Sequence, residues 1–316
     1  MSVAADRAQY LRGALYGLAA VSIWSGWIVV ARLGLRTSLT PWDIAALRFG
    51  VAGLLVLPYV IGKGFAFDRL GWVGLTAIVL GGAAPVFFAN WGLLFAPASH
   101  AGALFPGVMP LMVALLAAAL LHEEFTTIKK SGFALILSGV VAVVWSSGAE
   151  FGSWQNVGHG FFLGAGLAWA FYTIALRKAR LDGLHAAAIS TVGSMFLYLP
   201  IFAVIPVTTL VRASWSDIAL QAVVQGVLTA ILSLLLYGRA IGILGASSGA
   251  AFAALCPAMT ALLGIPILGE RPSIVEWSAI GLISAGVYIV SGGPLPRLRM
   301  GSSSSVARRL GSRTLR

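Results

Sequence analysis

The chain is a succession of long apolar stretches separated by short polar segments. Residues 70–121 contain no Asp, Glu, Lys or Arg, and neither do residues 218–238, 240–269 and 277–296. A helix rises about 1.5 Å per residue and needs roughly 20 apolar residues to cross the hydrocarbon core of a bilayer. The short polar–apolar alternation of a membrane β-barrel is not seen. The pattern predicts ten spanning helices, at about residues 11–33, 43–62, 71–95, 100–121, 128–147, 157–177, 184–205, 216–239, 246–268 and 273–293.

The two halves of the chain repeat each other. Shifting residues 100–143 by 147 positions gives 16 identities in 44 positions without a gap. A shift of 145 positions aligns Trp24 with Trp169 and Arg32 with Arg177. Internal repeats in an apolar chain are typical of transporters.

Each repeat holds five predicted helices, an odd number, so the two copies enter the membrane from opposite sides. Inverted repeats place a two-fold axis in the membrane plane and a solute site near the midplane. Two nearly equivalent halves can exchange conformations, which supplies alternating access. We therefore expect an all-α integral membrane protein with ten transmembrane helices in two inverted five-helix repeats. The expected boundaries are 11–147 and 157–293 for the repeats and 294–316 for a basic, disordered cytoplasmic tail.

Composition and charge support a membrane protein and predict its orientation. Hydrophobic residues make up 59% of the chain and charged residues 10%, whereas soluble domains carry roughly a quarter charged residues. The net charge of +11 reflects orientation rather than nucleic-acid binding. With a cytoplasmic N-terminus, sixteen of the 21 Lys and Arg residues fall in inner segments, four fall outside, and Arg48 lies within a span. Because Lys and Arg concentrate on the cytoplasmic side, we expect both termini in the cytoplasm and the chain in a bacterial inner membrane.

The fourth helix of each repeat carries the motifs of a known family. A proline lies within it and a glutamate closes it, Pro110 and Glu123 in the first copy and Pro257 and Glu270 in the second. An Arg-Phe pair begins at Arg48 in the second span. With these motifs the chain resembles the EamA-type permeases of the drug/metabolite transporter superfamily. The resemblance implies two five-helix repeats and a carrier function, with solutes in such permeases ranging over amino acids, sugars, polyamines, nucleotide-sugars and drugs.

Several prolines interrupt the apolar spans. Pro85, Pro106, Pro110, Pro257 and Pro266 each remove a backbone hydrogen bond, and each is expected to kink its helix. Irregular backbone within a membrane is tolerated where it is buried in protein or lines a watery cavity. The equivalent pair Pro110 and Pro257 is therefore the candidate for a bend that shapes the cavity; a packing kink without solute contact is the alternative.

Aromatic residues at related positions suggest the walls of a cavity. Trp24 and Trp27 are three residues apart and share a helix face, and the shift of 145 places them on Trp169 and Tyr172. Trp24 lies in mid-span, too deep for an interfacial aromatic belt. Two such pairs facing one cavity would suit apolar or cationic parts of a solute; plain helix packing is the alternative.

The eighth span carries a polar stripe. Residues at i and i+4 are neighbours on a helix, and polar groups are costly against lipid, so the stripe must face protein or water. The equivalent first-copy positions are mostly apolar, although Asn90 matches Tyr237. The asymmetry suggests a solute placed off the two-fold axis, with hydrogen bonding between helices as the alternative. The stripe consists of Gln221, Gln225, Thr229, Ser233 and Tyr237.

Arg48 is the one fully ionised residue well inside a predicted span. Intramembrane charges are functional candidates by default, because burying one costs a few kcal/mol. The planar guanidinium suits a carboxylate or phosphate of a solute. Two structural roles stay open beside this one, since the side chain can snorkel or can bond carbonyls of neighbouring helices.

Glu123 and Glu270 fall at span ends, one on each side of the membrane. We expect them to lock a loop near a gate, by capping the following helix or by pairing with Lys129, Lys130 or Arg271. No carboxylate lies deep in any span, so no proton or sodium relay is predicted, and neither is a metal site or a cofactor.

A channel, a membrane enzyme and a nucleotide-sugar carrier are the rival interpretations. The sequence starting at His122 resembles a metalloprotease motif but has Thr126 where the second histidine would stand, so we expect no enzyme. The expected partners are a small amino-acid-like or otherwise amphipathic solute and the lipid bilayer, with no nucleic acid and with a homodimer left open. The candidate solute-binding residues are Trp24, Trp27, Arg48, Asn90, Phe105, Pro110, Trp169, Tyr172, Gln225, Thr229, Ser233, Tyr237, Phe252 and Pro257.

Overall fold

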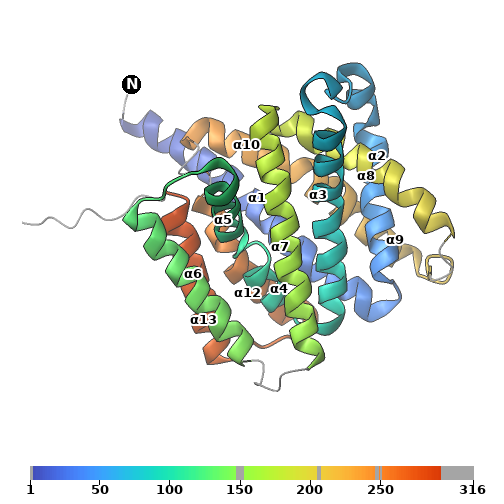
Figure 1. The fold of residues 1–316 in the computed structure, drawn as a ribbon. Helices are drawn as coiled ribbons and strands as arrows, with labels where there is room; N and C mark the ends of the chain where they lie inside the picture. Colours follow the sequence, from blue (N-terminus) through green and yellow to red (C-terminus); the bar gives the residue numbers. More distant parts are fainter. Residues whose placement is uncertain (1–2, 147–152, 205–207, 246–248, 250, 293–316) are drawn as a thin grey trace, which may run out of the picture.

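The computed structural model describes residues 3–146, 153–204, 208–245, 249 and 251–292, and every regular element within them is a helix (Figure 1). The expected tail at 294–316 lies outside the described residues. In chain order the elements are α1 (Val3–Thr37), α2 (Pro41–Lys63), α3 (Phe67–Phe95), α4 (Ala98–Leu104), α5 (Met109–Leu121), α6 (Thr127–Ser146), α7 (Trp154–Ala179), α8 (Gly183–Val204), α9 (Trp215–Gln221), η1 (Ala222–Leu232), α10 (Ser233–Leu244), η2 (Phe252–Leu255), α12 (Cys256–Leu268) and α13 (Ile274–Val290).

The helices are those of a membrane protein, which confirms the expected all-α membrane class. Eight helical segments of the described chain are long and apolar enough to span a bilayer, and two shorter apolar helices, Phe252–Leu268 and Ile274–Val290, follow them. Large apolar side chains stand exposed along their flanks. Four exposed tryptophans lie near helix ends, where indole rings sit at a membrane–water interface. They are Trp72, Trp145, Trp154 and Trp215.

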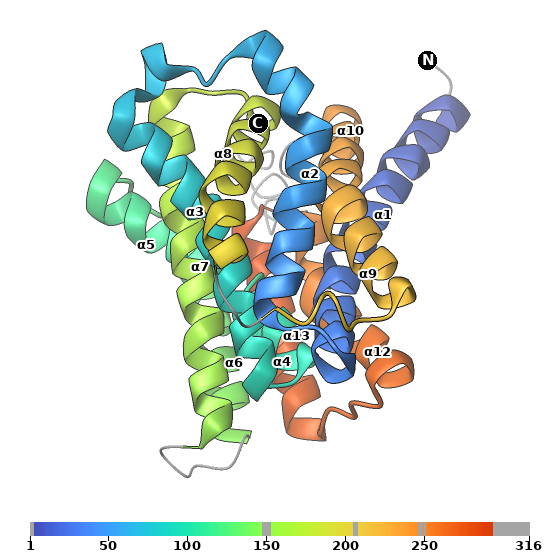
Figure 2. The same cartoon turned by 90° about the vertical axis from the view of Figure 1, so that its right-hand side faces the viewer.

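The contacts between helices stay the same when the two repeats are interchanged. Corresponding spans pack directly against each other: α2 against α8, the two fourth spans through α4 and α12, and α6 against α13. The remaining contacts come in matched sets, because α3 packs on α7 as η1 and α10 pack on α1, and α5 packs on α7 as α12 packs on α1. Figure 1 shows the α6–α13 and α3–α7 pairs side by side, and Figure 2 shows α1 beside α10. This is the pattern expected of two repeats related by a two-fold axis.

The fourth span of each repeat is broken at the same place. Residues 105–108 form turns between α4 and α5, and the corresponding four residues form the 3₁₀-helix η2 before α12. With the shift of 147, α5 falls on α12 from first residue to last. Pro110 and Pro257 stand at the second position of these helices, where a proline costs no hydrogen bond. The expectation of a bend at the prolines is thus corrected: the break precedes them, and they begin the helices that follow it.

The eighth predicted span is continuous from Trp215 to Leu244 but is not one regular α-helix. Its middle, η1, is a π-helix, in which each backbone bond reaches five residues back instead of four. The hydroxyl of Thr229 follows the same spacing and donates to the carbonyl of Val224 at 2.6 Å. The change of winding lies where the polar stripe meets α1 and α2.

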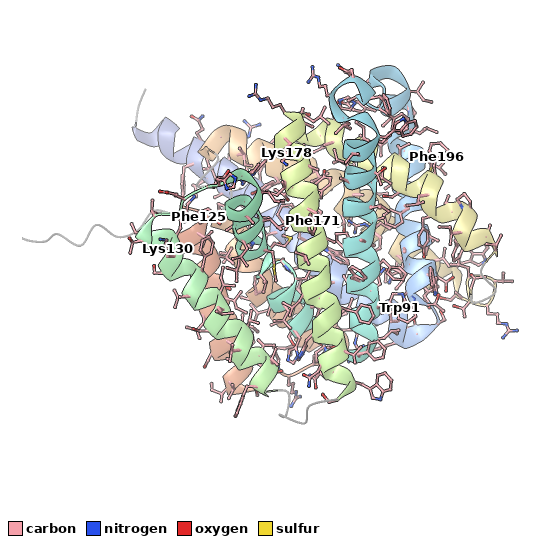
Figure 3. The ribbon with its side chains drawn as sticks, viewed as in Figure 1. Trp91, Phe125, Lys130, Phe171, Lys178 and Phe196 are labelled. Atoms are coloured by element: carbon pink, nitrogen blue, oxygen red, sulfur yellow. The ribbon has the colours of Figure 1, made fainter. Side chains whose placement is uncertain are left out.

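The bundle has two ends, which we name the Glu123 end and the Glu270 end after the two equivalent glutamates. The α2–α3, α5–α6 and α7–α8 connections meet at the Glu123 end, and the α3–α4 and α12–α13 connections meet at the Glu270 end (Figure 1). In Figure 3, Lys130 and Lys178 lie toward the first end and Trp91 toward the second.

Candidate functional site

A cavity of about 290 Å³ lies between the two repeats. Along α2 its lining begins at Arg48, seven residues from the Glu270 end of that helix. Along α8 it begins at Ala187, four residues from the Glu123 end. At about 1.5 Å per residue, the cavity stops about 10 Å short of the Glu270 end on α2 and reaches within about 6 Å of the Glu123 end on α8. The central cavity is therefore displaced toward the Glu123 end.

A second space continues in that direction. A cavity of about 320 Å³ lies among α5, α6, α7 and α13, and Met109 and Trp169 line both cavities. Glu123, Lys129 and Arg177 line the second one. The two spaces are thus neighbours across a shared wall, on the side of the molecule that carries Glu123.

Aromatic rings make up much of the wall of the central cavity. Trp24 of α1 packs on Tyr237 of α10 with ring centroids 4.8 Å apart, and Trp27 meets Phe105 edge-on at 6.4 Å. Trp169 and Tyr172 of α7 form a third pair at 5.2 Å. Such rings offer apolar faces to a solute. The predicted aromatic pairs of α1 and α7 therefore face one cavity, from opposite repeats.

Arg48 of α2 brings the only full charge among the described residues that line the cavity. Its Nη1 donates to Oε1 of Gln225 at 3.2 Å, and its guanidinium carbon lies 5.3 Å from the ring centroid of Trp27. No ion pair within 4 Å joins it to a described carboxylate. Both contacts orient the guanidinium, the first by a hydrogen bond and the second by a cation–π interaction.

Gln225 and Gln221 fix this arrangement to α1. Gln225 Nε2 donates to the carbonyl of Trp27 at 3.4 Å and to Oε1 of Gln221 at 3.2 Å, while Gln221 Nε2 donates to the carbonyl of Val30 at 2.6 Å. Both glutamine side chains are wholly buried. The first two residues of the polar stripe therefore form a set of hydrogen bonds from α9 and η1 to α1 that also holds Arg48.

Further along the stripe, Ser233 positions a tryptophan of the cavity wall. Ser233 Oγ accepts the indole N–H of Trp24 at 2.8 Å and donates to the carbonyl of Thr229 at 2.6 Å. Thr229 itself lines the cavity, as does Tyr237 four residues beyond Ser233. The stripe thus combines the two roles that its sequence left open, since it bonds helices together and also positions or supplies wall residues.

The candidates from the sequence divide into two groups by their placement. Eight line the central cavity: Trp24, Trp27, Arg48, Phe105, Trp169, Tyr172, Thr229 and Tyr237. Six do not, each for a visible reason. Gln225 and Ser233 lie behind the wall, Pro110 lines the second cavity, Pro257 begins α12 in a buried position, Phe252 packs against Gly17, and Asn90 is buried with both amide atoms unpaired.

The wall also contains residues that the sequence did not single out. Ser190, Thr191 and Ser194 of α8 line the cavity. Their hydroxyls donate to backbone carbonyls, Ser190 to Ile78 at 3.0 Å and Ser194 to Val79 at 3.3 Å. What they offer the cavity is therefore oxygen lone pairs. The spacing of these hydroxyls along the seventh span was the signal that could have identified them.

Glu123 and Glu270 are positioned by the same local structure. α5 ends at Leu121 and α12 at Leu268, and the next residues, His122 and Gly269, lie in the left-handed region with φ of 54° and 68°. The backbone N–H of each following glutamate donates to a carbonyl of the helix at 3.3 Å, Glu123 to Ala117 and Glu270 to Gly264, which is the equivalent residue under the shift of 147. Each bond reaches back six residues, one more than the 6→1 bond of a Schellman motif, around a residue in the left-handed region. Each glutamate therefore leaves its helix in the same direction relative to its own repeat.

Their ion pairs are equivalent but unequal. Glu270 Oε1 lies 3.5 Å from Nε of Arg32 and 3.0 Å from Nη2 of Arg36, and its Oε2 accepts the N–H of Ala98 at 2.8 Å. Among the described residues Glu123 has a single ion pair, at 3.4 Å to Nη1 of Arg177, which is the residue that the shift of 145 aligns with Arg32. The expected partners Lys129, Lys130 and Arg271 were wrong for both, because each glutamate turns toward the long helix that begins its neighbour repeat. Ser273 and Glu276 cap α13 instead of Glu270.

Two further networks join helices at the Glu270 end. His100 of α4 bonds through Nδ1 to Nε2 of His159 of α7 at 2.9 Å and through Nε2 to the carboxylate of Glu276 on α13. Asp43 of α2 accepts hydrogen bonds from Thr208 and Thr209, at 2.7 and 2.8 Å, in the segment before α9. No cluster of three or more metal-ligating side chains occurs in the part of the chain that the structure describes. These contacts tie helices of both repeats together at one end.

Comparison with known proteins identifies the family. The model of the EamA-like transporter family matches twice, at residues 11–145 and 156–292. The chain is 26% identical over 268 residues to the "Uncharacterized transporter YyaM" of Bacillus subtilis (strain 168), covering 80% of this chain and 85% of that protein. A solved structure titled only "Crystal structure of protein" shares the fold with a TM-score of 0.61 at 22% identity, covering 88% of this chain and 95% of the other. The resemblance noted from the motifs is confirmed: the chain belongs to the EamA-like transporter family.

Proposed function

We propose that this protein is a carrier that moves a small solute across a bacterial inner membrane by alternating access through the central cavity. In this proposal ten helices span the membrane as two inverted five-helix repeats. The eight long apolar helices supply eight spans, and the two shorter ones, Phe252–Leu268 and Ile274–Val290, supply the last two. The matched packing of the repeats supports the inversion, since corresponding elements meet across one axis.

The main support for alternating access is the inequality of the two equivalent ion pairs. Arg32–Glu270 and Arg177–Glu123 are equivalent pairs in the two repeats. In the described part of the chain, the side chain of Glu270 has two further contacts and that of Glu123 has none. A two-fold related structure at rest would make both alike. One conformation in which they differ implies another in which the difference is reversed, and passing between the two is alternating access.

The conformation described is the one closed at the Glu270 end. Three networks join helices there, while Arg177–Glu123 is the one long-range ion pair among the described residues of the other end. The central cavity is displaced toward the Glu123 end as well. Sixteen Lys and Arg residues against four support a cytoplasmic Glu123 end. In this orientation the structure is inward-facing.

Counterflow in proteoliposomes tests the proposal. The purified protein is reconstituted, the vesicles are loaded with a high concentration of one unlabelled metabolite, and uptake of the same labelled metabolite is followed. A carrier exchanges solute across a closed cycle, so uptake transiently exceeds equilibrium for the right member of a panel. A channel produces simple equilibration, and a membrane enzyme produces a chemically altered metabolite; either result would replace the carrier proposal.

A further inference from the structure

The charge balance of the central cavity is unusual for a site that accepts cations. Among the described residues that line it there is one arginine, Arg48, and no Asp, Glu, Lys or His. The rest of the wall is aromatic, aliphatic or hydroxylic. A single positive charge therefore faces the space in which the solute would lie.

Most hydrogen-bond donors of Arg48 have no acceptor among the described residues. A guanidinium carries five N–H donors in a planar fork. Among the described residues only Nη1 has an acceptor, the amide oxygen of Gln225 at 3.2 Å. Nε and Nη2 make no hydrogen bond to the described residues, and neither is sealed from the cavity. An arginine whose role was only to join helices would direct these donors at carbonyls or carboxylates.

The unspent donors are held in a fixed direction. Gln225 is wholly buried and is itself bonded to α1, and the ring of Trp27 lies beneath the guanidinium. Because the neighbouring groups are already ordered, an incoming anion has little more to organise. Arg48 has the geometry for a bidentate pair with a planar anion.

Resting on the carrier function proposed above, we propose that the solute is a small monocarboxylate with an apolar or aromatic body. Its carboxylate pairs with Nε and Nη2 of Arg48. Its body lies against the rings of Trp24, Trp169 and Tyr172, and a neutral hydroxyl or amide on the body donates to the hydroxyl oxygens of α8. The aromatic wall and the single cation thus select an anionic amphipath.

Charge counting separates this class from others that the fold could carry. One arginine balances one negative charge, whereas a phosphate monoester carries about −1.5 to −2 at neutral pH and a nucleotide-sugar diphosphate is also multiply charged. An excess charge in a low-dielectric cavity is costly. A polyamine or other cation meets repulsion from Arg48 and finds no carboxylate in the described wall. The ammonium of a zwitterion is likewise left without a charged partner.

Binding to the purified protein in detergent tests the class without requiring transport. Isothermal titration calorimetry would compare 3-phenylpropionate with its amide, with phenethylamine, with phenylalanine and with phenyl phosphate. A hydrogen bond to a charged group is worth enough to predict about 10- to 100-fold tighter binding of the carboxylate than of the amide. Equal binding of carboxylate and amide, or tighter binding of the amine, the zwitterion or the phosphate, would overturn the proposal.

Variants locate the effect at Arg48. In Arg48→Gln the preference for carboxylate over amide is expected to disappear, and in Arg48→Lys to return only in part, because an ammonium lacks the fork. Arg212→Gln makes the same charge change at an exposed site and should keep the full preference. If Arg48→Gln folds and retains the preference, Arg48 does not hold the carboxylate. If it does not fold, the ligand series on the unaltered protein decides the matter.

Counterflow separates a wrong class from a wrong function. Carboxylates that bind with the predicted preference but show no counterflow would leave the class standing and remove the carrier function. Counterflow of amines or sugars without any of carboxylates would do the reverse.

Discussion

The ion pairs at the two ends of the bundle make a quantitative prediction about the conformational equilibrium. Glu270→Gln removes one negative charge from the closed end and keeps the size and the accepting oxygen of the side chain. Glu123→Gln makes the same change at the equivalent position of the other repeat. If the contacts of Glu270 hold the Glu270 end closed, the first variant should shift the population toward the state open at that end, and the second should shift it little.

The magnitude follows from burial and distance. The side chains of Glu270 and Arg32 are 9% and 16% exposed, whereas Arg36 is 40% exposed and its contact is correspondingly discounted. A hydrogen bond to a charged group is worth about 1 kcal/mol more than a neutral one, which applies to the N–H of Ala98. The Arg32 contact is an ion pair at 3.5 Å, worth about 1 kcal/mol, so the two contacts together lose about 2 kcal/mol. That corresponds to about a 30-fold shift in the equilibrium.

The matched variant has a much smaller expectation. Glu123 and Arg177 are 43% and 47% exposed and make one contact at 3.4 Å. An exposed pair of this kind is worth about 0–1 kcal/mol, which is at most about a fivefold shift. The two variants differ chemically by nothing but their place in the structure.

A single-cysteine reporter measures the shift. Cys256 is replaced by alanine, and Ala31→Cys places a thiol on α1 beside Arg32, at a residue that is wholly buried in this conformation. A membrane-impermeant maleimide added outside the cell reaches it only when the Glu270 end opens. The labelling rate should rise about 30-fold with Glu270→Gln, following the shift in population. An unchanged rate with Glu270→Gln, or an equal rise with Glu123→Gln, would refute the reasoning.

Two further predictions concern orientation and the polar stripe. Alkaline phosphatase fused after Arg316 should be inactive, because both ends are expected in the cytoplasm, and strong periplasmic activity would reverse the assignment. Gln225→Leu and Ser233→Ala should lower transport per folded molecule more than they lower expression. Each removes the hydrogen bond that orients a residue of the cavity wall, Arg48 in the first variant and Trp24 in the second. Normal rates with normal apparent affinity in both variants would reduce the stripe to interhelical bonding.

Much of the fold was predictable because it is periodic and repeated. Apolar stretches of helical length locate the spans, and α5 and α12 coincide under the same shift that aligned their sequences. The break after Leu104 and the π-helix η1 were not predicted, since both depend on how neighbouring helices pack. A proline marks irregular backbone nearby but not its position, because proline is also favoured at a helix start.

The candidate site was predictable where spacing fixes a helix face. Trp24 and Trp27, three residues apart, share a wall in the structure, as do their counterparts on α7. The hydroxyls of α8 were missed because serines and threonines occur on every face of apolar helices, so the one-turn spacing of Ser190 and Ser194 does not stand out. The partners of Glu270 were missed for a different reason. Arg32 lies 238 positions away along the chain, and sequence alone favours pairing with charged residues a few positions away.

Asn90 of α3 gives a last prediction, which joins the repeat to the conformational cycle. It is wholly buried, and neither atom of its amide has a hydrogen-bond partner among the described residues, an arrangement that costs about 1–3 kcal/mol. Its counterpart Tyr237 lines the cavity. If the repeats exchange conformations, Asn90 lines a cavity open to the Glu270 end, where water satisfies the amide. Asn90→Leu, of similar size, should therefore stabilise the conformation described here, raise the unfolding temperature and slow labelling of the Ala31→Cys reporter.

Ser284 is the matched control, because its hydroxyl is also buried and unpaired among the described residues, but its counterpart Leu137 is exposed on the flank of the bundle. Ser284→Ala should leave the labelling rate unchanged. Equal labelling rates in both variants would show that Asn90 does not enter the opposite state as proposed.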